Sequence, residues 1–154
     1  MLIIIQARYS SNRLPGKVLK KINQKPLLKY MTDSISKLNN KHDLVVATSL
    51  SESDDQVVSF CKENNVNFYR GNLRNVSKRF QLALKNYQGK YFMRLCADSP
   101  LISKFEIDRF IDFSKNNNHD LITNRYCNYP KGQTIEVIKT KIFNKFIKYF
   151  STEE

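Results

Sequence analysis

LIIIQ at Leu2–Gln6 runs directly into ARYSSNRLPGK at Ala7–Lys17. A short apolar run that ends at a loop is typical of a buried strand in a parallel sheet. The loop then begins at the carboxyl end of that strand, which is where open α/β sheets bind their ligands. We therefore expect this loop to lie in a ligand-binding site.

The loop combines cationic side chains, small polar side chains and a Pro-Gly turn. Cations neutralise phosphate oxygens, and a turn can direct backbone N–H groups toward an anion. These features predict a polyphosphate site, although the Walker pattern G-x-x-x-x-G-K-[ST] is absent. The alternative is a solvated surface loop that serves no ligand. The residues concerned are Arg8, Ser10, Ser11, Asn12, Arg13, Pro15, Gly16 and Lys17.

The charge around the loop is one-sided, because every charged residue before Asp33 is basic. Such a segment suits an anionic ligand. The whole chain carries a formal net charge of +12, which is also compatible with nucleic-acid binding. The lysines are spread along the chain, however, and no aromatic residues are interleaved with a basic stripe. Composition therefore argues against a nucleic-acid binder.

Apolar runs alternate with helical patterns along the rest of the sequence. This alternation predicts a mostly parallel sheet that is flanked by helices, which is an α/β fold. No linker or repeat divides the chain, so we expect one domain over residues 1–154. The expected strands are Leu2–Gln6, Asp43–Thr48, Asn67–Tyr69, Lys90–Cys96, Asp120–Thr123 and Thr134–Ile138.

Five helices are expected between and after these strands. Pro26 can open the first helix, since proline is favoured at the first helical position. Ser53 with Gln56, and Ser103 with Glu106, match the capping-box pattern at the start of the second and fourth helices. The apolar stripes are Leu28, Met31, Ile35 and Leu38; Val57, Val58 and Cys61; Val76, Phe80, Ala83, Leu84 and Tyr87; Ile107, Phe110 and Ile111; and Ile142, Phe143, Phe146, Ile147 and Phe150.

A second polar segment, Arg94-Leu-Cys-Ala-Asp-Ser-Pro100, also follows a predicted buried strand. Asp98 comes where the chain leaves the sheet, and Pro100 favours a turn there. A carboxylate that faces a triphosphate loop is a typical Mg²⁺ ligand, because Mg²⁺ keeps several waters and takes one or two carboxylates. Alternatively, Asp98 caps the turn that follows. Together with the basic loop, the pattern favours a Mg²⁺ site.

The composition bounds the class of protein further. The three cysteines, Cys61, Cys96 and Cys127, are far apart, which argues against a disulfide framework or a zinc site. The sequence contains no apolar run that could cross a membrane and no secretory leader. We therefore expect a cytoplasmic protein without a membrane partner.

A series of motifs follows along the chain, of which Ile5–Leu19 is the first and most specific. The weaker motifs are Val45–Thr48, Tyr69–Gly71, Val76 with Arg79, Arg94–Leu101, and Tyr129-Pro130 with Gly132. In order and spacing these motifs resemble those of the cytidylyltransferase superfamily, which includes the CMP-Kdo and CMP-acylneuraminate synthetases. The spore-coat polysaccharide type is the most similar.

This resemblance implies a Rossmann-like three-layer α/β/α sandwich. It implies that CTP and an acidic sugar give a CMP-sugar and pyrophosphate, with Mg²⁺ as cofactor, in surface polysaccharide synthesis. It also implies a possible homodimer. By resemblance, Arg13, Lys17 and Asp98 are catalytic and Asp98 binds the metal. The nucleotide would contact Ala7, Arg8, Ser11, Arg13, Lys17, Ala47, Thr48, Arg79 and Arg94, and the sugar would contact Tyr129 and Glu136.

The chain departs from the family pattern in two respects. Lys131, Thr134 and Asn75 stand where acidic residues are usual, and the family's second acidic motif, near the C-terminus, has no counterpart before residue 154. We therefore expect a domain that is short at its C-terminus. Three alternatives stay open: a non-catalytic or partner-dependent nucleotide-binding domain, a nucleotidyltransferase for another nucleoside triphosphate, and a glycosyltransferase.

Overall fold

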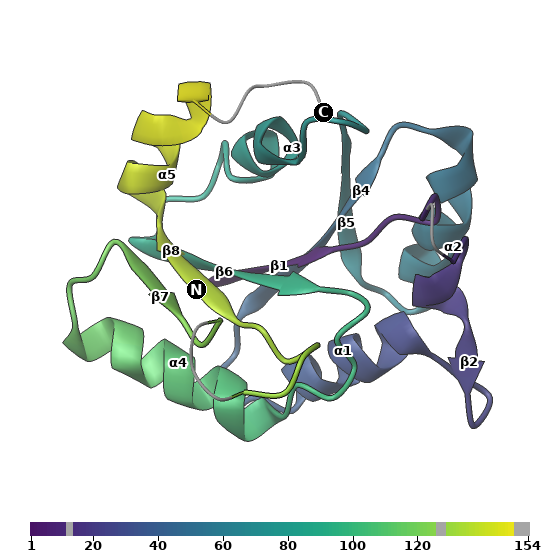
Figure 1. Cartoon of the computed structure of the whole chain (residues 1–154), viewed down its shortest axis with the longest axis horizontal. Helices are drawn as coiled ribbons and strands as arrows, with labels where there is room; N and C mark the ends of the chain where they lie inside the picture. The colour runs from purple at the N-terminus through teal and green to yellow at the C-terminus, as the bar shows by residue number, and fades with distance from the viewer. Residues whose placement is uncertain (12–13, 126–128, 150–154) are drawn as a thin grey trace.

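The computed structural model describes residues 1–11, 14–125 and 129–149 of the chain. A sheet of six strands runs through the middle of the domain in the order β5-β4-β1-β6-β8-β7 (Figure 1). Two short strands, β2 and β3, form a separate hairpin. The strands are β1 Leu2–Gln6, β2 Lys21–Ile22, β3 Lys25–Pro26, β4 Asp43–Ser49, β5 Asn67–Gly71, β6 Tyr91–Cys96, β7 Leu121–Thr123 and β8 Glu136–Lys139.

Strand β1 lies at the centre of the sheet and fixes its polarity. Leu2 pairs in parallel with Asp43 of β4 on one side and with Phe92 of β6 on the other. Strand β5 is parallel to β4, so the carboxyl ends of four neighbouring strands meet at one edge. Strand β8 runs antiparallel to β6 and β7, and Glu136 at its start therefore reaches that same edge beside Arg94.

Helices cover both faces of the sheet, as Figure 1 shows for α1 and α4 on one face and for α3 and α5 on the other. The alternation of side chains along β1 explains these two layers, because successive residues of a strand point to opposite faces. Ile3 and Ile5 pack with one core cluster, and Leu2 and Ile4 pack with the other. The helices are α1 Leu27–Ser36, α2 Asp55–Glu63, α3 Val76–Ala83, α4 Lys104–Asn116 and α5 Thr140–Phe146, and the 3-10 turns are η1 Lys17–Leu19, η2 Glu52–Asp54 and η3 Ile147–Tyr149.

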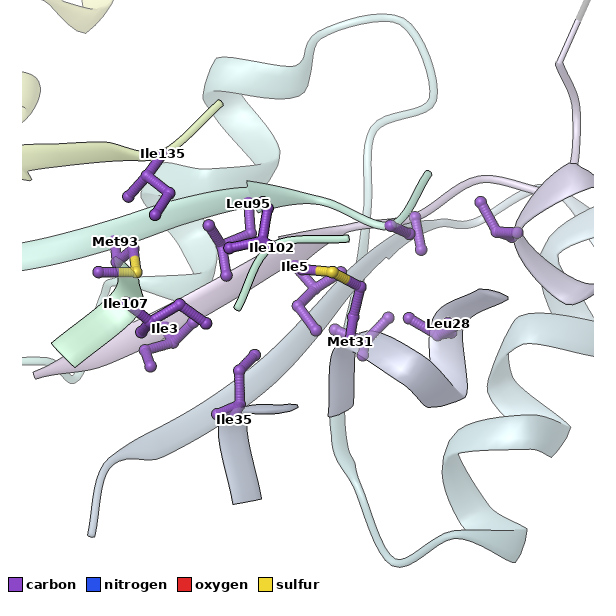
Figure 2. Packing of buried hydrophobic residues seen from close by; sticks show 14 of the residues in the cluster. Ile3, Ile5, Leu28, Met31, Ile35, Met93, Leu95, Ile102, Ile107 and Ile135 are labelled. Atoms are coloured by element: carbon purple, nitrogen blue, oxygen red, sulfur yellow. The ribbon is translucent and has the colours of Figure 1, made fainter. Parts of the chain in front are cut away.

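The larger cluster joins the sheet to α1, α2 and α4. Figure 2 shows Ile3 and Ile5 of β1 beside Met31 and Ile35 of α1 and Ile107 of α4. All of these side chains except Ile35 are fully buried, and Ile35 is 5% exposed. This three-layer arrangement confirms the α/β class and the mostly parallel sheet that the sequence predicts. Burial of this apolar surface is the main source of the domain's stability.

Helix starts follow the sequence prediction only in part. The Ser103 side chain caps α4, since it accepts a hydrogen bond of 3.3 Å from the backbone N–H of Glu106. The Ser53–Gln56 capping box was predicted wrongly, because α2 begins after η2 without a side-chain cap and the Ser53 hydroxyl lies 3.0 Å from that of Ser51. Pro26 pairs with Lys21 in the β2–β3 hairpin and precedes α1.

The strand boundaries also shift by one to two residues. Strands β4 and β5 run on to Ser49 and Gly71, because each keeps pairing with its neighbour. Strand β8 starts at Glu136 and not at Thr134. The last apolar stripe forms α5 and η3, while Phe150 lies outside the described residues. No helix in the described part of the chain has the length and apolar character needed to cross a membrane.

Candidate functional site

The loop after β1 is fixed at both ends by backbone hydrogen bonds. The Ala7 N–H donates to the carbonyl of Ala47 over 3.1 Å and so extends the pairing with β4. Further along, the Tyr9 carbonyl accepts from the N–H groups of Ser11 (3.0 Å) and Gly16 (2.8 Å). Gly16 has a φ of +69°, a conformation that glycine adopts without strain. These contacts hold residues 7–11 and 14–17 in place at the carboxyl edge of the sheet.

Lys17 and Asp98 form an ion pair between this loop and the end of β6. Their side chains are 23% and 39% exposed, so both charges reach solvent. The pair forms because β1 and β6 are parallel neighbours, and the Ala97 N–H donates to the carbonyl of Gln6 over 3.0 Å. The carboxylate of Asp98 therefore faces the basic loop, as the sequence predicts.

A pocket of about 720 Å³ opens between the loop, the end of β6 and the segment that follows β5. Three predicted phosphate ligands, Arg8, Ser11 and Lys17, line it together with Asp98. Its lining carries three cations and one carboxylate among the described residues. The full lining is Gln6, Arg8, Ser10, Ser11, Lys17, Val18, Leu73, Arg74, Cys96 and Asp98. Arg13, which the sequence also assigns to this site, lies outside the described residues.

The segment after β5 forms the wall opposite the basic loop. Arg8 Nη1 donates to the carbonyl of Leu73 over 3.3 Å, which links the two walls. The Asn72 side chain accepts from the N–H groups of Arg74 and Asn75 and shapes the turn, while the Asn75 side chain caps α3 at Lys78. Sequence reasoning missed Leu73 and Arg74 as lining residues, because they carry no motif of their own.

Arg79 lies behind this wall and does not line the pocket. Its side chain is fully buried, and Nη1 donates to the carbonyl of Asn72 over 2.9 Å. Nε and Nη2 of Arg79 have no hydrogen-bond partner within the described part of the chain. Burial, and then the charge of Arg8, lower the pKa of Arg79 to about 10, although the carboxylate of Asp54 opposes this shift. Arg79 thus stabilises the segment after β5 through its hydrogen bond to Asn72 in the protein interior.

Ala47 and Thr48 are also completely buried, at the end of β4. Neither lines the pocket, and the carbonyl of Ala47 is used by the N–H of Ala7. The Thr48 hydroxyl is buried near the carboxylate of Asp54, whose pKa it helps to lower. The sequence predicts that Ala47 and Thr48 border the base. In the structure both residues are instead buried beneath the surface of the pocket and do not line it.

A second pocket of about 310 Å³ adjoins the first, and both are lined by Cys96. Arg94 links the two pockets. Its Nη1 donates to Glu136 of the second pocket over 2.8 Å, and its Nη2 donates to the side chain of Gln6, which lines the first pocket, over 3.0 Å. The antiparallel strand β8 brings Glu136 here. The lining residues are Arg94, Cys96, Arg125, Thr134 and Glu136, of which Arg125 was not predicted from the sequence.

Tyr129 lies apart from both pockets. Its hydroxyl donates to Glu106 of α4 over 2.6 Å and also contacts Arg109. The hydrogen bond to the Glu106 carboxylate raises the pKa of Tyr129. The structure therefore brings Glu136 to the second pocket and leaves Tyr129 against α4.

Asp98 fits the role of a Mg²⁺ ligand by its donor chemistry. Mg²⁺ is bound by one or two carboxylates together with phosphate oxygens and water, so a single exposed carboxylate beside a phosphate-binding loop suffices. No group of three or more His, Cys, Asp or Glu side chains capable of holding a metal occurs among residues 1–11, 14–125 and 129–149. A metal at Asp98 would consequently depend on oxygen atoms of the ligand.

Cys61 and Cys96 are free cysteines in the described part of the chain. Cys61 is buried in the core, and burial raises its pKa to about 12. Cys96 is half-buried at the junction of the two pockets, and burial raises its pKa. Cys127 lies outside the described residues.

The fold and the pocket define an α/β domain with a basic, pocket-lining loop at the carboxyl edge of its sheet. The chain belongs to the cytidylyltransferase family, whose model matches residues 2–152. It is 34% identical over 122 residues to an uncharacterized protein of Methanocaldococcus jannaschii, covering 79% of this chain and 50% of that protein. It is 29% identical over 148 residues to the spore coat polysaccharide biosynthesis protein SpsF of Bacillus subtilis, covering 92% of this chain and 60% of the relative.

Solved structures show the same architecture. A cytidylyltransferase from Leptospira borgpetersenii superposes with a TM-score of 0.88 at 28% identity, over 95% of this chain and 63% of that one. A CMP-2-keto-3-deoxy-manno-octonic acid synthetase in complex with CTP shares the fold, with a TM-score of 0.72 at 15% identity, over 96% of this chain and 77% of that one. The chain spans about half to three fifths of the length of the two curated relatives described above.

Proposed function

We propose that this chain is a nucleotidyltransferase domain that transfers CMP from CTP to an acidic sugar and releases pyrophosphate. The observation that carries this proposal is the pocket that Arg8, Ser11 and Lys17 line together with Asp98, with Lys17 paired to Asp98. The family supports cytidylyl transfer, and SpsF, named for spore coat polysaccharide biosynthesis, supports a role in surface polysaccharide synthesis. A cytoplasmic location, where nucleoside triphosphates are available, is part of the proposal.

The triphosphate is assigned to the loop of residues 7–17. Arg8 and Lys17 supply charge-assisted hydrogen bonds, and Ser11 supplies a neutral donor. Arg13 belongs to the same proposal on the strength of its place in the sequence motif. In the free protein Asp98 balances the charge of Lys17. A bound triphosphate would take over that role and free the carboxylate for Mg²⁺.

The reaction forms one bond and breaks another. A hydroxyl oxygen of the sugar bonds to the α-phosphorus, and the bond from that phosphorus to the oxygen bridging to the β-phosphate breaks. Pyrophosphate leaves, and the hydroxyl proton passes to solvent. Mg²⁺, held by Asp98 and phosphate oxygens, would supply neutralisation of the developing negative charge. Lys17 and Arg8 orient the phosphates and stabilise the same charge from the protein side.

The acidic sugar is assigned to the second pocket. Arg94 and Arg125 suit a carboxylate, and Glu136 and Thr134 can bond sugar hydroxyls. Cys96 lines both pockets, so a sugar bound here would lie next to a nucleotide bound in the first. Tyr129 contacts Glu106 and Arg109 and is left out of this assignment.

A second candidate is a nucleotide-binding domain without turnover. Asp98 is the single carboxylate that lines the larger pocket in the described part of the chain, whereas Mg²⁺ sites often use two. The two candidates share the nucleotide and differ in the chemical step.

The test is pyrophosphate release by the purified chain with Mg²⁺, each of the four nucleoside triphosphates and a panel of acidic sugars. Release that requires CTP and one acidic sugar is the result we expect. Thermal stabilisation by CTP without pyrophosphate release would support the binding domain instead. Neither release nor stabilisation with any nucleotide would contradict both candidates.

A further inference from the structure

Asp54 has no place in the sequence motifs, yet it is completely buried at the end of η2. One carboxylate oxygen accepts a hydrogen bond of 2.6 Å from the backbone N–H of Tyr9 in the basic loop. The other oxygen accepts from the backbone N–H of Ser49 over 2.9 Å and from the Ser49 hydroxyl. A single buried carboxylate thus ties the loop after β1 to the end of β4.

Tyr9 is the residue on which the loop closes. Its N–H binds Asp54, and its carbonyl accepts from Ser11 and Gly16 at the far end of the loop. Its ring lies against Gly16, where a Cβ atom would come within 2.9 Å of the ring carbons. A displacement of the Tyr9 peptide would therefore shift both ends of the loop, including the start of η1 at Lys17.

The charge of Asp54 matters for this anchoring. Burial alone raises the pKa of this carboxyl, but the hydrogen bonds from Ser49 and Tyr9 outweigh it and the net pKa is lowered. The group is therefore ionised at neutral pH, and hydrogen bonds to an ionised acceptor are stronger than neutral ones. The negative charge of Asp54 also acts on the buried guanidinium of Arg79, whose pKa it raises. Burying an ionised carboxylate is costly unless such partners hold it.

We propose that Asp54 is a positioning residue that holds the triphosphate-binding loop in its binding conformation through the Tyr9 peptide. The expected effect of Asp54 on nucleotide binding rests on the proposed function. The anchoring of the loop by Asp54 does not, because it follows from the hydrogen bonds to Tyr9 and Ser49 alone. Asparagine at residue 54 would turn one acceptor oxygen into an NH₂ donor. In either orientation of that amide the Tyr9 N–H loses its ionised acceptor, because it faces the NH₂ group or keeps only a neutral carbonyl oxygen, which accepts a weaker hydrogen bond.

The first measurement is amide hydrogen exchange of the loop in Asp54→Asn, with Asp55→Asn as the matched control. Asp55 is the neighbouring carboxylate on the same turn, but it pairs with Arg70 at the surface. We expect the Tyr9 and Gly16 amides to exchange roughly ten- to a hundredfold faster in Asp54→Asn, in keeping with the loss of a charge-assisted bond. Equal exchange rates in the two variants would overturn the proposal.

Ligand binding separates this proposal from the proposed function. If the wild type binds CTP, Asp54→Asn should weaken binding of CTP and of inorganic pyrophosphate about tenfold or more while leaving cytidine binding unchanged. Equal weakening of cytidine would show a general structural role and overturn the positioning role. If the wild type binds no nucleotide, the proposed function fails, and the exchange measurement still decides the role of Asp54.

A milder pair of variants serves if Asp54→Asn does not fold. Ser49→Ala removes one donor to Asp54, whereas Ser51→Ala removes a hydroxyl that faces Ser53. We expect faster exchange of the Tyr9 amide in Ser49→Ala alone. Identical Tyr9 exchange in both variants would contradict the anchoring role.

Discussion

At the scale of single residues, Lys17 and Asp98 connect the two segments that the sequence marks as functional. Lys17 follows the Pro-Gly turn of the loop, and Asp98 follows β6. Their pairing is a consequence of parallel strands, which bring distant segments to one edge of the sheet. Each residue has a distinct expected contribution to nucleotide binding.

Lys17→Ala should weaken CTP binding without unfolding the domain. The change removes one cation from the phosphate loop, and a charge-assisted hydrogen bond is worth about 1.5–3 kcal/mol, which corresponds to roughly ten- to a hundredfold in affinity. Calorimetric titration measures the affinity, and urea unfolding measures the stability. Lys115→Ala, on the exposed end of α4, is the control. Affinity equal to that of the control would remove Lys17 from the site.

Asp98→Asn should remove the effect of Mg²⁺ on CTP binding. The substitution keeps the size of the side chain but removes the charge that a hard cation requires. The measurement is the ratio of CTP affinities with Mg²⁺ and with a chelator, which should fall toward unity in the variant. A ratio as large as that of the wild type would show that the metal is held elsewhere.

Asp54 and Arg125 contribute to the site or its support, but no sequence pattern identifies either residue. Asp54 lies between Ser53 and Gln56, whose spacing predicts a capping box, and no sequence motif includes Asp54 itself. Only the fold shows that this carboxylate turns inward to Tyr9 and Ser49. Arg125 reaches the second pocket because it follows β7, whose antiparallel pairing with β8 places Thr123 opposite Glu136, and periodicity does not reveal this pairing.

At the scale of elements, β1 determines most of the architecture. Its residues alternate between the two core clusters, so the sheet needs a helical layer on each face. Hydrophobic periodicity was enough to predict these layers, since every expected strand and helix occurs. Boundaries were less predictable, because the last residues of β4 and β5 owe their strand conformation to pairing with a neighbour.

Ile5→Ala should destabilise the domain by about 2–5 kcal/mol, because it leaves a cavity in the larger core cluster. Ile5 is fully buried between α1 and α4 (Figure 2), whereas Leu121 on the edge strand β7 is 55% exposed. Leu121→Ala is therefore the control, with an expected cost of about 0.5 kcal/mol or less. Urea denaturation measures both. Equal costs would contradict the central position of β1.

At the scale of the whole molecule, the two pockets lie side by side at one edge of the sheet and share Cys96. The net charge of +12 favours the approach of an anionic nucleotide. The larger pocket could be predicted from the sequence, since its loop follows the first strand directly. The second pocket could not be predicted, because its lining residues come from β6, from β8 and from the turn after β7, and the sequence does not show that these segments are neighbours.

Titration of CTP into the wild-type chain with Mg²⁺ tests the central claim most directly, since every role assigned to the loop depends on a bound triphosphate. We expect binding at one site, with CTP bound more tightly than CMP and CMP more tightly than cytidine, because each phosphate adds charge for Arg8 and Lys17 to neutralise. Absence of CTP binding, or equal affinity for CTP and cytidine, would contradict the assignment of the loop to the triphosphate.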